Sequence, residues 1–267
     1  MFTDTHCHLY LEYYQDDLDA VLQRAWEAGL TRILLPGIDL NTSLQAMAIS
    51  ESDPRIFAAV GVHPNNCADW NPSWIDELRD MAAHPKVRAV GEIGMDYYWE
   101  ETSHDLQVEV LRAQLELAAA LNLPVVIHNR EAWDGLWPLL SEWRQDLEAR
   151  GSELAQRPGV LHSFEGDIDQ ARDAMREHFL IGISGPVTFK NARARQDLAA
   201  QLPLSAMLTE TDSPYLTPDP FRGRRNEPAH VVRITDKIAD LQQQRLERVA
   251  HITRQNATRL FRWDDID

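Results

Sequence analysis

Six histidine and carboxylate residues lie at the ends of apolar, strand-like segments that are spread from the first to the last part of the chain. They are His6, His8, Glu92, His128, His162 and Asp212. A loop and a helical pattern follow each of these segments. In a closed barrel of parallel strands, the carboxyl ends of all strands surround one mouth. The sequence therefore predicts a closed barrel with a single site rich in metal ligands at its mouth.

Eight strand segments alternate with helical patterns along the chain. The strand segments are 2–6, 32–37, 57–63, 87–93, 124–128, 159–164, 179–184 and 206–211, and the helical patterns include 16–28, 104–122, 131–149 and 167–178. Several strands are continuous apolar runs, such as RILLPG and PVVIH. Such runs are typical of parallel strands that are buried on both faces.

This alternation predicts an α/β fold, a single (β/α)8 TIM barrel that spans residues 1–267 as one domain. No linker rich in Pro, Gly or Ser divides the chain, and residues 228–262 predict two more helices, so that the outer ring gains an extra C-terminal helix. A doubly wound sheet is the alternative fold. The candidate ligands are spread from the first strand to the last, and this spread favours a closed barrel over an open sheet.

The composition limits where the protein works. No run approaches the roughly 20 apolar residues of a membrane-spanning helix, so we expect no membrane partner. No signal peptide is visible at the N-terminus. The only cysteines are Cys7 and Cys67, which argues against a disulfide framework and favours a cytoplasmic location. No obligatory protein partner is evident.

The charge of the chain is strongly negative. The 26 basic and 42 acidic residues give a net charge of −16. Proteins that bind nucleic acids tightly usually carry a basic surface, so this charge argues against tight, non-specific binding to duplexes. It does not exclude catalysis on strand ends.

The six residues suit a centre with two divalent metal ions. His6 and His8 are two apart on a strand, so their imidazoles project from the same face. Two ions about 3.5–4 Å apart need a bridging carboxylate, for which Glu92 is the candidate. Such ions lower the pKa of a bound water towards about 7, and Asp212 could bind one ion and also accept the proton of that water. Mg²⁺ or Mn²⁺ is expected, although a site of histidines and carboxylates also accepts Zn²⁺, Co²⁺ or Ni²⁺.

Two further carboxylates lie close to the ligands in the sequence. Glu210 precedes Asp212 by two residues, and we expect it to support a ligand rather than to bind an ion. Asp4 lies one layer below His6 on the same face, where a buried hydrogen-bonding role is expected.

Motifs along nearly the whole chain resemble the TatD family of metal-dependent deoxyribonucleases, which belongs to the amidohydrolase-like barrels. The motifs are DTHCHL, GVHPN, VGEIGMDYY, PVVIHNREA, HSFEG, TETDSPYL, RGRRNEP and TRQNATRLF. The resemblance implies one metal held by His6, His8, Glu92 and Asp212, and a second held by Glu92, His128 and His162. It also implies 3′–5′ exonuclease or general phosphodiester hydrolysis with Mg²⁺ or Mn²⁺, and therefore DNA as a partner.

Four residues are candidates for binding substrate phosphates: His63, Arg130, Arg222 and Arg224. His63, in GVHP, lies at the rim that carries the functional residues of such barrels. Guanidinium groups match phosphate geometry. Arg224 and Arg225 could instead form structural ion pairs, for example with Glu227.

The aromatic residues of the GMDYY motif leave a similar choice open. Tyr97 and Tyr98 could stack on a nucleobase, as aromatic residues do in proteins that bind single strands. They could equally pack at the rim of the barrel.

The sequence therefore predicts a divalent-metal-dependent phosphodiester hydrolase, a 3′–5′ exodeoxyribonuclease in which Asp212 and Glu92 are the catalytic residues. The alternative is a carbonyl-directed hydrolase on the same barrel: an aminoacyl-tRNA deacylase, a lactonase or an amidase. Carbonyl-directed members often carry a carboxylated bridging lysine. No lysine stands at the expected strand ends here, which weakens the lactonase and amidase alternatives but not the deacylase. A non-enzymatic barrel with structural metals is disfavoured, because six ligands shared by two ions leave open coordination positions.

Overall fold

The computed structural model describes residues 1–99 and 101–263 and contains one eight-stranded parallel sheet. The strands are β1 (Phe2–Asp4), β2 (Leu30–Pro36), β3 (Ile56–Val60), β4 (Val87–Asp96), β5 (Val125–Arg130), β6 (Gly159–Leu161), β7 (Leu180–Ile183) and β8 (Met207–Thr209). Each strand pairs in parallel with the next along the chain. This order is that of a barrel, and it is not the order of a doubly wound sheet, which reverses at its centre.

Hydrogen bonds beyond the ends of β1 and β8 close the barrel. The backbone N–H of Thr5 donates to Thr209 O at 3.2 Å, and that of His8 donates to Ser213 O at 2.8 Å. The N–H of Asp212 donates in turn to His6 O at 2.8 Å. The predicted (β/α)8 barrel is therefore confirmed, and the segments that carry the first and last candidate ligands lie side by side.

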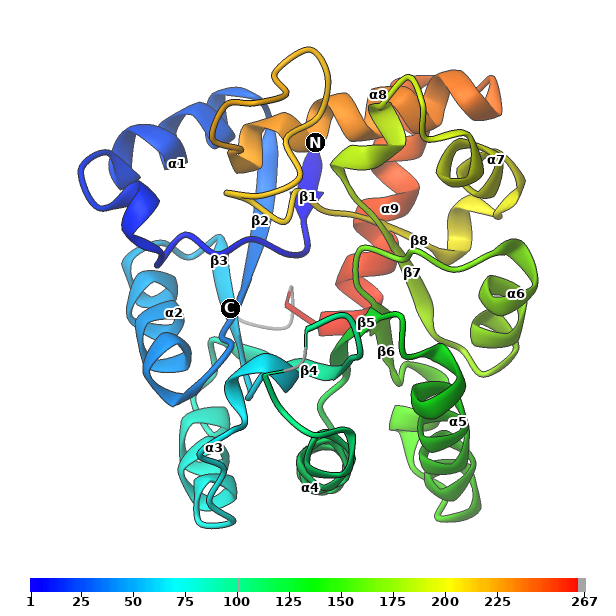
Figure 1. Ribbon diagram of the computed structural model, residues 1–267. Coiled ribbons are helices and arrows are strands. Elements are labelled where there is room, and N and C mark those ends of the chain that lie inside the picture. The colour runs from blue at the N-terminus through cyan, green and yellow to red at the C-terminus, as the bar shows by residue number, and fades with distance from the viewer. Residues whose placement is uncertain (100, 264–267) are drawn as a thin grey trace.

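Helices surround the strands (Figure 1). They are α1 (Leu18–Glu27), α2 (Leu40–Ser52), α3 (Trp74–Ala82), α4 (His104–Leu121), α5 (Trp133–Ala149), α6 (Ile168–Arg176), α7 (Arg193–Gln201), α8 (Val231–Gln242) and α9 (Leu246–Phe261). Two helices, α8 and α9, follow β8, which confirms the extra C-terminal helix. None of the helices in residues 1–99 and 101–263 is long and apolar enough to cross a membrane.

Side chains that point inward from the strands form a core inside the barrel. Phe57, Val126 and Leu208 are buried there, in one cluster with Phe261 and Trp263 from the end of α9 and just beyond it. The rings of Phe57 and Trp263 are 5.5 Å apart. The C-terminal helix thus contributes its last apolar residues to the barrel core, which leaves the opposite end, the mouth, for polar residues.

Several strands end earlier than the sequence predicts. β1, β6 and β8 stop at Asp4, Leu161 and Thr209, so His6, His162 and Asp212 lie just beyond the ladders. Ser163 and Asp212 have positive φ angles of 42° and 56°, a left-handed conformation that cannot continue a strand. The chain therefore turns at the mouth, and the polar side chains there are presented by turns rather than by paired strands.

Candidate metal centre

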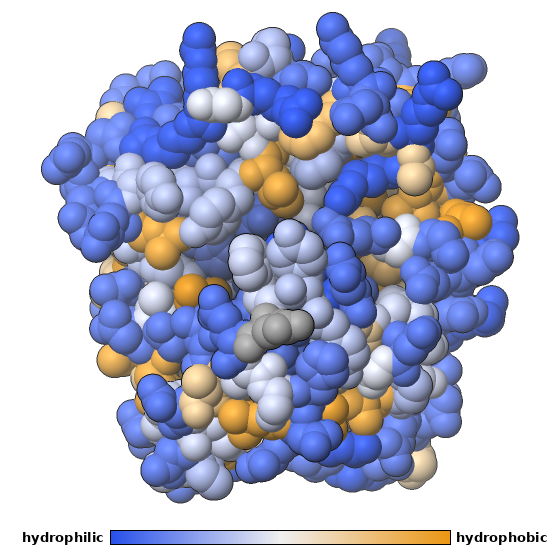
Figure 2. All heavy atoms as spheres, viewed as in Figure 1, coloured by the Kyte–Doolittle hydropathy of each residue, from blue (hydrophilic) through white to orange (hydrophobic). Residues whose placement is uncertain are grey.

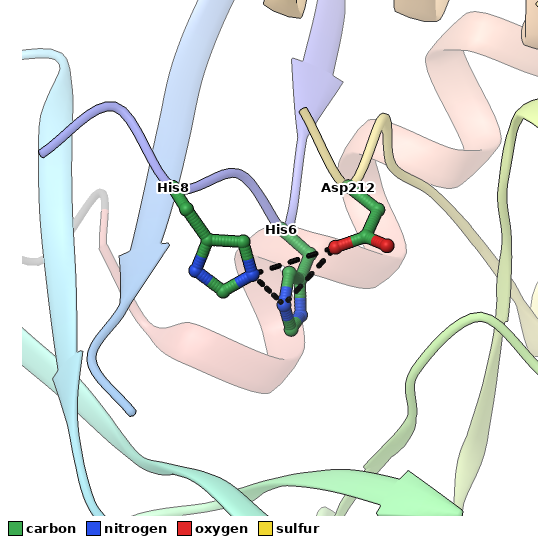
Figure 3. A group of neighbouring side chains, drawn as sticks. All are labelled: His6, His8 and Asp212. Carbon is green, nitrogen blue, oxygen red and sulfur yellow. Dashed lines mark hydrogen bonds and ion pairs between the residues drawn. The ribbon is translucent and has the colours of Figure 1, made fainter. Parts of the chain in front are cut away.

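His6, His8 and Asp212 form a compact group where β1 and β8 meet (Figure 3). The Nε2 atoms of the two histidines are 3.1 Å apart. Asp212 Oδ1 is 3.4 Å from His8 Nε2 and 3.8 Å from His6 Nε2. Three side chains from opposite ends of the sequence thus point their ligand atoms at one position, as an ion would require.

The carboxylate of Glu92 lies between two groups of histidines. Its Oε2 is 3.1 Å from His6 Nε2 and 3.7 Å from His8 Nε2. Its Oε1 is 3.0 Å from His128 Nδ1 and 3.7 Å from His63 Nε2. Each oxygen therefore faces a different group, which is the arrangement of a bridging carboxylate.

A glycine lets β4 and β5 approach closely enough to bring Glu92 beside His128. Gly94 has a φ of 148°, and a Cβ atom at this position would lie 2.0 Å from His128 O. Any other residue would therefore force the two strands apart and separate Glu92 from His128.

The spacing of the donor atoms fits a small divalent ion. Bonds of 2.0–2.2 Å in a tetrahedral site place the ligand atoms about 3.3–3.6 Å from one another. The distances among His6, His8, Asp212 and Glu92 range from 3.1 to 3.8 Å. Imidazole and carboxylate donors of this kind bind divalent transition metals, and the carboxylates also suit Mg²⁺ and Mn²⁺.

Two of the histidines are oriented by buried carboxylates. His128 Nε2 is 3.0 Å from Asp96 Oδ2, and His162 Nδ1 is 2.9 Å from Glu210 Oε1. A proton on each of these nitrogens leaves the other nitrogen of the ring with a free lone pair. Such carboxylate–histidine pairs are the usual support for a histidine that binds a metal.

His8 is oriented in a similar way by neutral groups. Its Nδ1 lies 2.7 Å from Tyr10 Oη and 3.2 Å from Pro36 O. Tyr10 Oη donates to the same carbonyl at 2.9 Å, so it can accept from His8 Nδ1. A proton on Nδ1 would leave a free lone pair on His8 Nε2, the atom that faces Asp212.

His162 lies closer to the first group than the resemblance implies. Its ring stacks on that of His6, with centroids 3.4 Å apart, and its Nε2 is 3.6 Å from Asp212 Oδ1. The compact groups that contain Glu92 are Glu92 with His6 and His162, and Glu92 with His63 and His128. A second ion bound by Glu92, His128 and His162 stays a prediction.

His63 carries its proton on the nitrogen that faces the site. It precedes the 3-10 turn Pro64–Asn66, and its Nδ1 accepts a hydrogen bond from the backbone N–H of Asn65 at 3.1 Å. Burial lowers the pKa of His63 to about 3, so the ring is neutral and its single proton is on Nε2. This protonated nitrogen can donate to a substrate oxygen, whereas it lacks the lone pair that an ion would need.

The charges of the site are set by competition between burial and neighbouring ions. Burial opposes the charged forms of His128 and His162, but nearby carboxylates outweigh it and raise their pKa values to about 9 and about 10. Burial would raise the pKa of Glu92 and Asp212, but the histidines hold both below their ordinary values. An entering cation therefore meets ionised carboxylates and must replace protons on two imidazoles.

Asp4 has the buried hydrogen-bonding role expected from the sequence. Its carboxyl accepts hydrogen bonds from Thr211 N at 2.9 Å, from Thr211 Oγ1 at 2.6 Å and from His6 N at 3.3 Å. Burial, only partly offset by these hydrogen bonds, raises the pKa of Asp4 to about 8. Asp4 therefore ties the end of β1 to the end of β8 below the ligands.

A cavity of about 630 Å³ opens at the mouth of the barrel above these residues. Seven candidate site residues line it: His8, His63, Glu92, His128, Arg130, His162 and Asp212. Its volume is within the range of about 300–1,000 Å³ that is usual for small-molecule and cofactor sites. The face of the protein in Figure 2 is mostly hydrophilic, and its hydrophobic residues are in small, separate patches.

The predicted arginines do not all lie at this cavity. Arg130 lines it, and its guanidinium carbon lies 3.8 Å from the ring centroid of Tyr98. Arg222 stacks instead over Phe189 at 4.0 Å, and neither it nor the exposed Arg224 is among the lining residues. Substrate binding by Arg222 and Arg224 stays a prediction.

Arg225 has the structural role that the sequence left open. Its guanidinium is 2.7 Å from Asp17 and 3.0 Å from Glu227. Glu227 also pairs with Arg24 at 2.7 Å. This network ties the loop after β8 to α1.

Sequence reasoning did not identify Asp96 as part of the site. Asp96 is 1% exposed, and its carboxylate holds His128. Its position gave a signal: Glu92 and Asp96 are four apart on one strand and so lie on the same face. The predicted end of that strand at residue 93 hid this relation, because β4 continues to Asp96.

Comparison with known proteins identifies the family of this barrel. Residues 3–262 match the family model described as TatD related DNase. The chain belongs to the TatD family of metal-dependent hydrolases.

Relatives in this family cover nearly the whole chain. The chain is 41% identical to the uncharacterized metal-dependent hydrolase YabD of Bacillus subtilis over 98% of its own length and 99% of the relative. It is 35% identical to the 3′-5′ ssDNA/RNA exonuclease TatD of Enterobacter lignolyticus, over 92% of this chain and 93% of that protein. The crystal structure of YjjV, a TatD homologue from Escherichia coli K12, superposes with a TM-score of 0.89 at 30% identity and covers 98% of both chains.

Proposed function

We propose that this TatD-family hydrolase cleaves phosphodiester bonds at the 3′ ends of single-stranded DNA and uses two divalent ions. The observation that carries the proposal is the placement of Glu92, whose two oxygens face two separate groups of histidines. The 35% identity to a relative named as a 3′-5′ ssDNA/RNA exonuclease supports the choice of substrate.

In this proposal the candidate ligands divide between two positions. His6, His8, Asp212 and one oxygen of Glu92 hold the first ion, and the other oxygen of Glu92 holds the second with His128 and His162. Two bound ions would supply an activated water and neutralise charge on the phosphate. Mg²⁺ or Mn²⁺ is the proposed pair, because both ions accept carboxylate and water ligands.

Asp212 is the proposed base that takes the proton of the attacking water. Its side chain is 15% exposed, whereas those of Glu92, Asp96 and Glu210 are 4%, 1% and 0% exposed. Water can therefore reach Asp212 more easily than the other carboxylates of the site. Burial would raise the pKa of Asp212, but the neighbouring histidines hold it below its ordinary value, so the carboxylate is in the ionised form that a proton acceptor requires.

Two residues are proposed to position the phosphate. The Nε2–H of His63 would donate a hydrogen bond to a phosphate oxygen, and Arg130 would contribute a positive charge at the rim of the cavity. Neither His63 nor Arg130 competes with the candidate ligands for the ions, because neither supplies a lone pair to them.

We also propose that the protein works in a reducing compartment such as the cytoplasm. Cys7 and Cys67 are both free and buried, so the fold uses them as packing residues. Protection from thiol reagents in the folded protein would agree with this, whereas a disulfide in protein isolated from cells would contradict it.

The function can be tested by removing metals from the protein and then adding back Mg²⁺, Mn²⁺ or Zn²⁺. Single-stranded DNA labelled at the 3′ or the 5′ end is the substrate, and a Glu92→Ala variant of equal thermal stability is the control. Metal-dependent loss of 3′ nucleotides that the variant lacks would support the proposal. Inert DNA together with turnover of a lactone or an aminoacyl-tRNA would assign the same barrel to carbonyl chemistry instead.

A further inference from the structure

Exposed aromatic side chains stand on two sides of the metal centre. The large exposed hydrophobic residues of the described chain include Tyr98 and Trp99, each 48% exposed, and Tyr215, which is 49% exposed. Trp99 and Tyr215 line the cavity. Single exposed aromatics are common, but aromatic faces at the edge of a polar cavity indicate a surface that binds planar groups.

The topology puts these two residues on opposite sides of the cavity. Trp99 follows β4 and Tyr215 follows β8, and these strands are four apart in a closed ring of eight. Strands four apart in such a ring face one another across the barrel. The candidate metal ligands therefore lie between Trp99 and Tyr215.

Trp99 is fixed relative to the metal centre. Its backbone N–H donates to Asp96 Oδ1 at 3.1 Å, while the other oxygen of Asp96 holds His128. Its ring packs edge to face on Tyr98, with centroids 5.0 Å apart. The indole is thus positioned by the same carboxylate that orients a candidate ligand.

Tyr215 is fixed in a comparable way on the other side. Its backbone N–H donates to Asp212 O at 2.8 Å. Its ring packs edge to face against His8 and Tyr13, with centroids 6.5 Å away in both pairs. Trp99 is therefore tied to the candidate ligand His128 through Asp96, and Tyr215 contacts the candidate ligands Asp212 and His8 directly.

Charge alone gives this cavity little attraction for a polyanion. Arg130 is the only Arg or Lys among the described residues that line it. Glu165 also lines it and pairs with Arg195 at 2.6 Å. Beyond the proposed ions, His63 and Arg130, the cavity of this chain of net charge −16 has few groups that could pair with phosphates, so contacts with the bases are a needed source of further binding energy.

We propose that Trp99 and Tyr215 are stacking platforms for the two nucleobases on either side of the cleaved phosphate. This inference rests on the proposed phosphodiesterase function and makes unpaired bases at the strand end a requirement for binding. A base inside a duplex is paired and stacked between its neighbours, so its face is not free to stack on Trp99 or Tyr215, and single strands and frayed ends are the substrates. Stacking is tolerant of sequence, because every base has a π-face.

The test uses Trp99→Leu and Tyr215→Leu, which keep an apolar side chain but remove the aromatic face. Loss of one stacked base weakens binding about 5- to 150-fold. We expect KM for a single-stranded oligonucleotide to rise by this factor while kcat changes less than about threefold. Trp99→Phe should retain most of the affinity, and Leu44→Ala, at an exposed residue of α2 that does not line the cavity, should match the wild type.

A second substrate separates stacking from general damage to the site. It is the same oligonucleotide with abasic residues in its last two 3′ positions, so its phosphodiesters are kept and its terminal bases are absent. Wild-type KM should rise on this substrate, and neither leucine variant should raise it further. Fluorescence anisotropy in EDTA, with no hydrolysis, should give the same ratios of Kd for the two oligonucleotides.

Each outcome has a distinct meaning. Equal KM values for wild type and both leucine variants on the normal oligonucleotide would overturn the inference and leave the phosphodiesterase function intact. So would equal wild-type KM values for the normal and abasic ends. If the metal-loaded wild type cleaves neither oligonucleotide, the proposed function fails, and the stacking inference falls with it.

Discussion

Asp96 offers a sharp test of the metal centre, because it touches a candidate ligand without facing an ion itself. In an Asp96→Asn variant the side chain keeps its size, and Oδ1 can still accept the backbone N–H groups of Tyr98 and Trp99. What is lost is the negative charge 3.0 Å from His128 Nε2, together with the hydrogen bond that the same oxygen accepts from Asn65 Nδ2 at 3.1 Å. The variant therefore removes the charged support of His128 and one hydrogen bond to the loop after β3.

The size of the effect follows from what the carboxylate does to His128. Although burial opposes the charged form of the imidazole, Asp96 and Glu92 raise its pKa from 6.5 to about 9. A partner that makes an imidazole more basic also strengthens its bond to a metal, and losing such a partner costs about 10- to 100-fold in metal affinity. This corresponds to about 1.4–2.8 kcal/mol.

Isothermal titration of metal-stripped protein with Mn²⁺ or Zn²⁺ measures this directly. We expect two binding events in the wild type and a 10- to 100-fold loss in only one of them in Asp96→Asn. Asp167→Asn is the matched control, because Asp167 caps α6 and does not line the cavity. In a His128→Ala background, Asp96→Asn should cause no further loss, because the two residues act as one unit.

Unchanged affinities in Asp96→Asn would refute the assignment of His128 as a ligand oriented by Asp96. An equal loss in both binding events would also refute it, because the carboxylate would then act on the whole site rather than through one imidazole.

Three further predictions concern the bridge, the ions and the loop after β8. Glu92→Gln removes the charge between the two groups of histidines, so hydrolysis should fall about 10³-fold or more, and a variant with a tenth of wild-type activity would contradict the bridge. Refilling the stripped protein with metal at about one hundred times Kd should add about 2.7 kcal/mol of stability for each ion bound. Each ion should therefore raise Tm by about 5–10 °C in differential scanning fluorimetry, and an unchanged Tm would argue against ion binding by the folded state. Burial disfavours the ionised carboxylate of Glu227, but Arg24 and Arg225 outweigh burial and lower the pKa of Glu227 below 4.5. The stability that this carboxylate contributes is therefore present above pH 4.5 and is lost as the pH falls through the pKa of the folded state. Glu227→Gln should therefore cost about 1–2 kcal/mol in urea unfolding at pH 7 and much less in acid, and an equal cost at both pH values would contradict the role of its charge.

The barrel could be predicted from local patterns because each strand of a parallel barrel carries its own signal. Apolar runs such as RILLPG are buried on both faces wherever they lie in the ring, and helical patterns separate them. The ends of the strands were harder to predict. A left-handed residue such as Ser163 stops a strand through its backbone conformation, which side-chain pattern alone does not reveal.

The candidate site was predictable as a set of residues but not as an arrangement. A histidine or carboxylate at the end of a strand indicates metal binding, and the sequence of that one segment is enough to identify it. Which nitrogen of His63 is protonated depends on one hydrogen bond from Asn65. The exposure of Trp99 and the distance of Arg222 from the cavity likewise depend on how loops fold back on the barrel.

The sequence by itself determined the fold class, the family and the chemical types of the residues at the mouth. The fold class and the residue types depend on composition and periodicity within single segments, where neighbours in sequence are neighbours in space, and the family follows from the resemblance of motifs such as DTHCHL and TETDSPYL. Only the tertiary structure decided that Glu92 faces two groups of histidines, that Asp96 orients His128, that His162 is the ligand beside Glu210, and that aromatic side chains stand on both sides. Those relations join residues up to about 200 positions apart, as with the hydrogen bond between Asp212 and His6, and closure of the barrel is the physical event that brings them within a few ångströms.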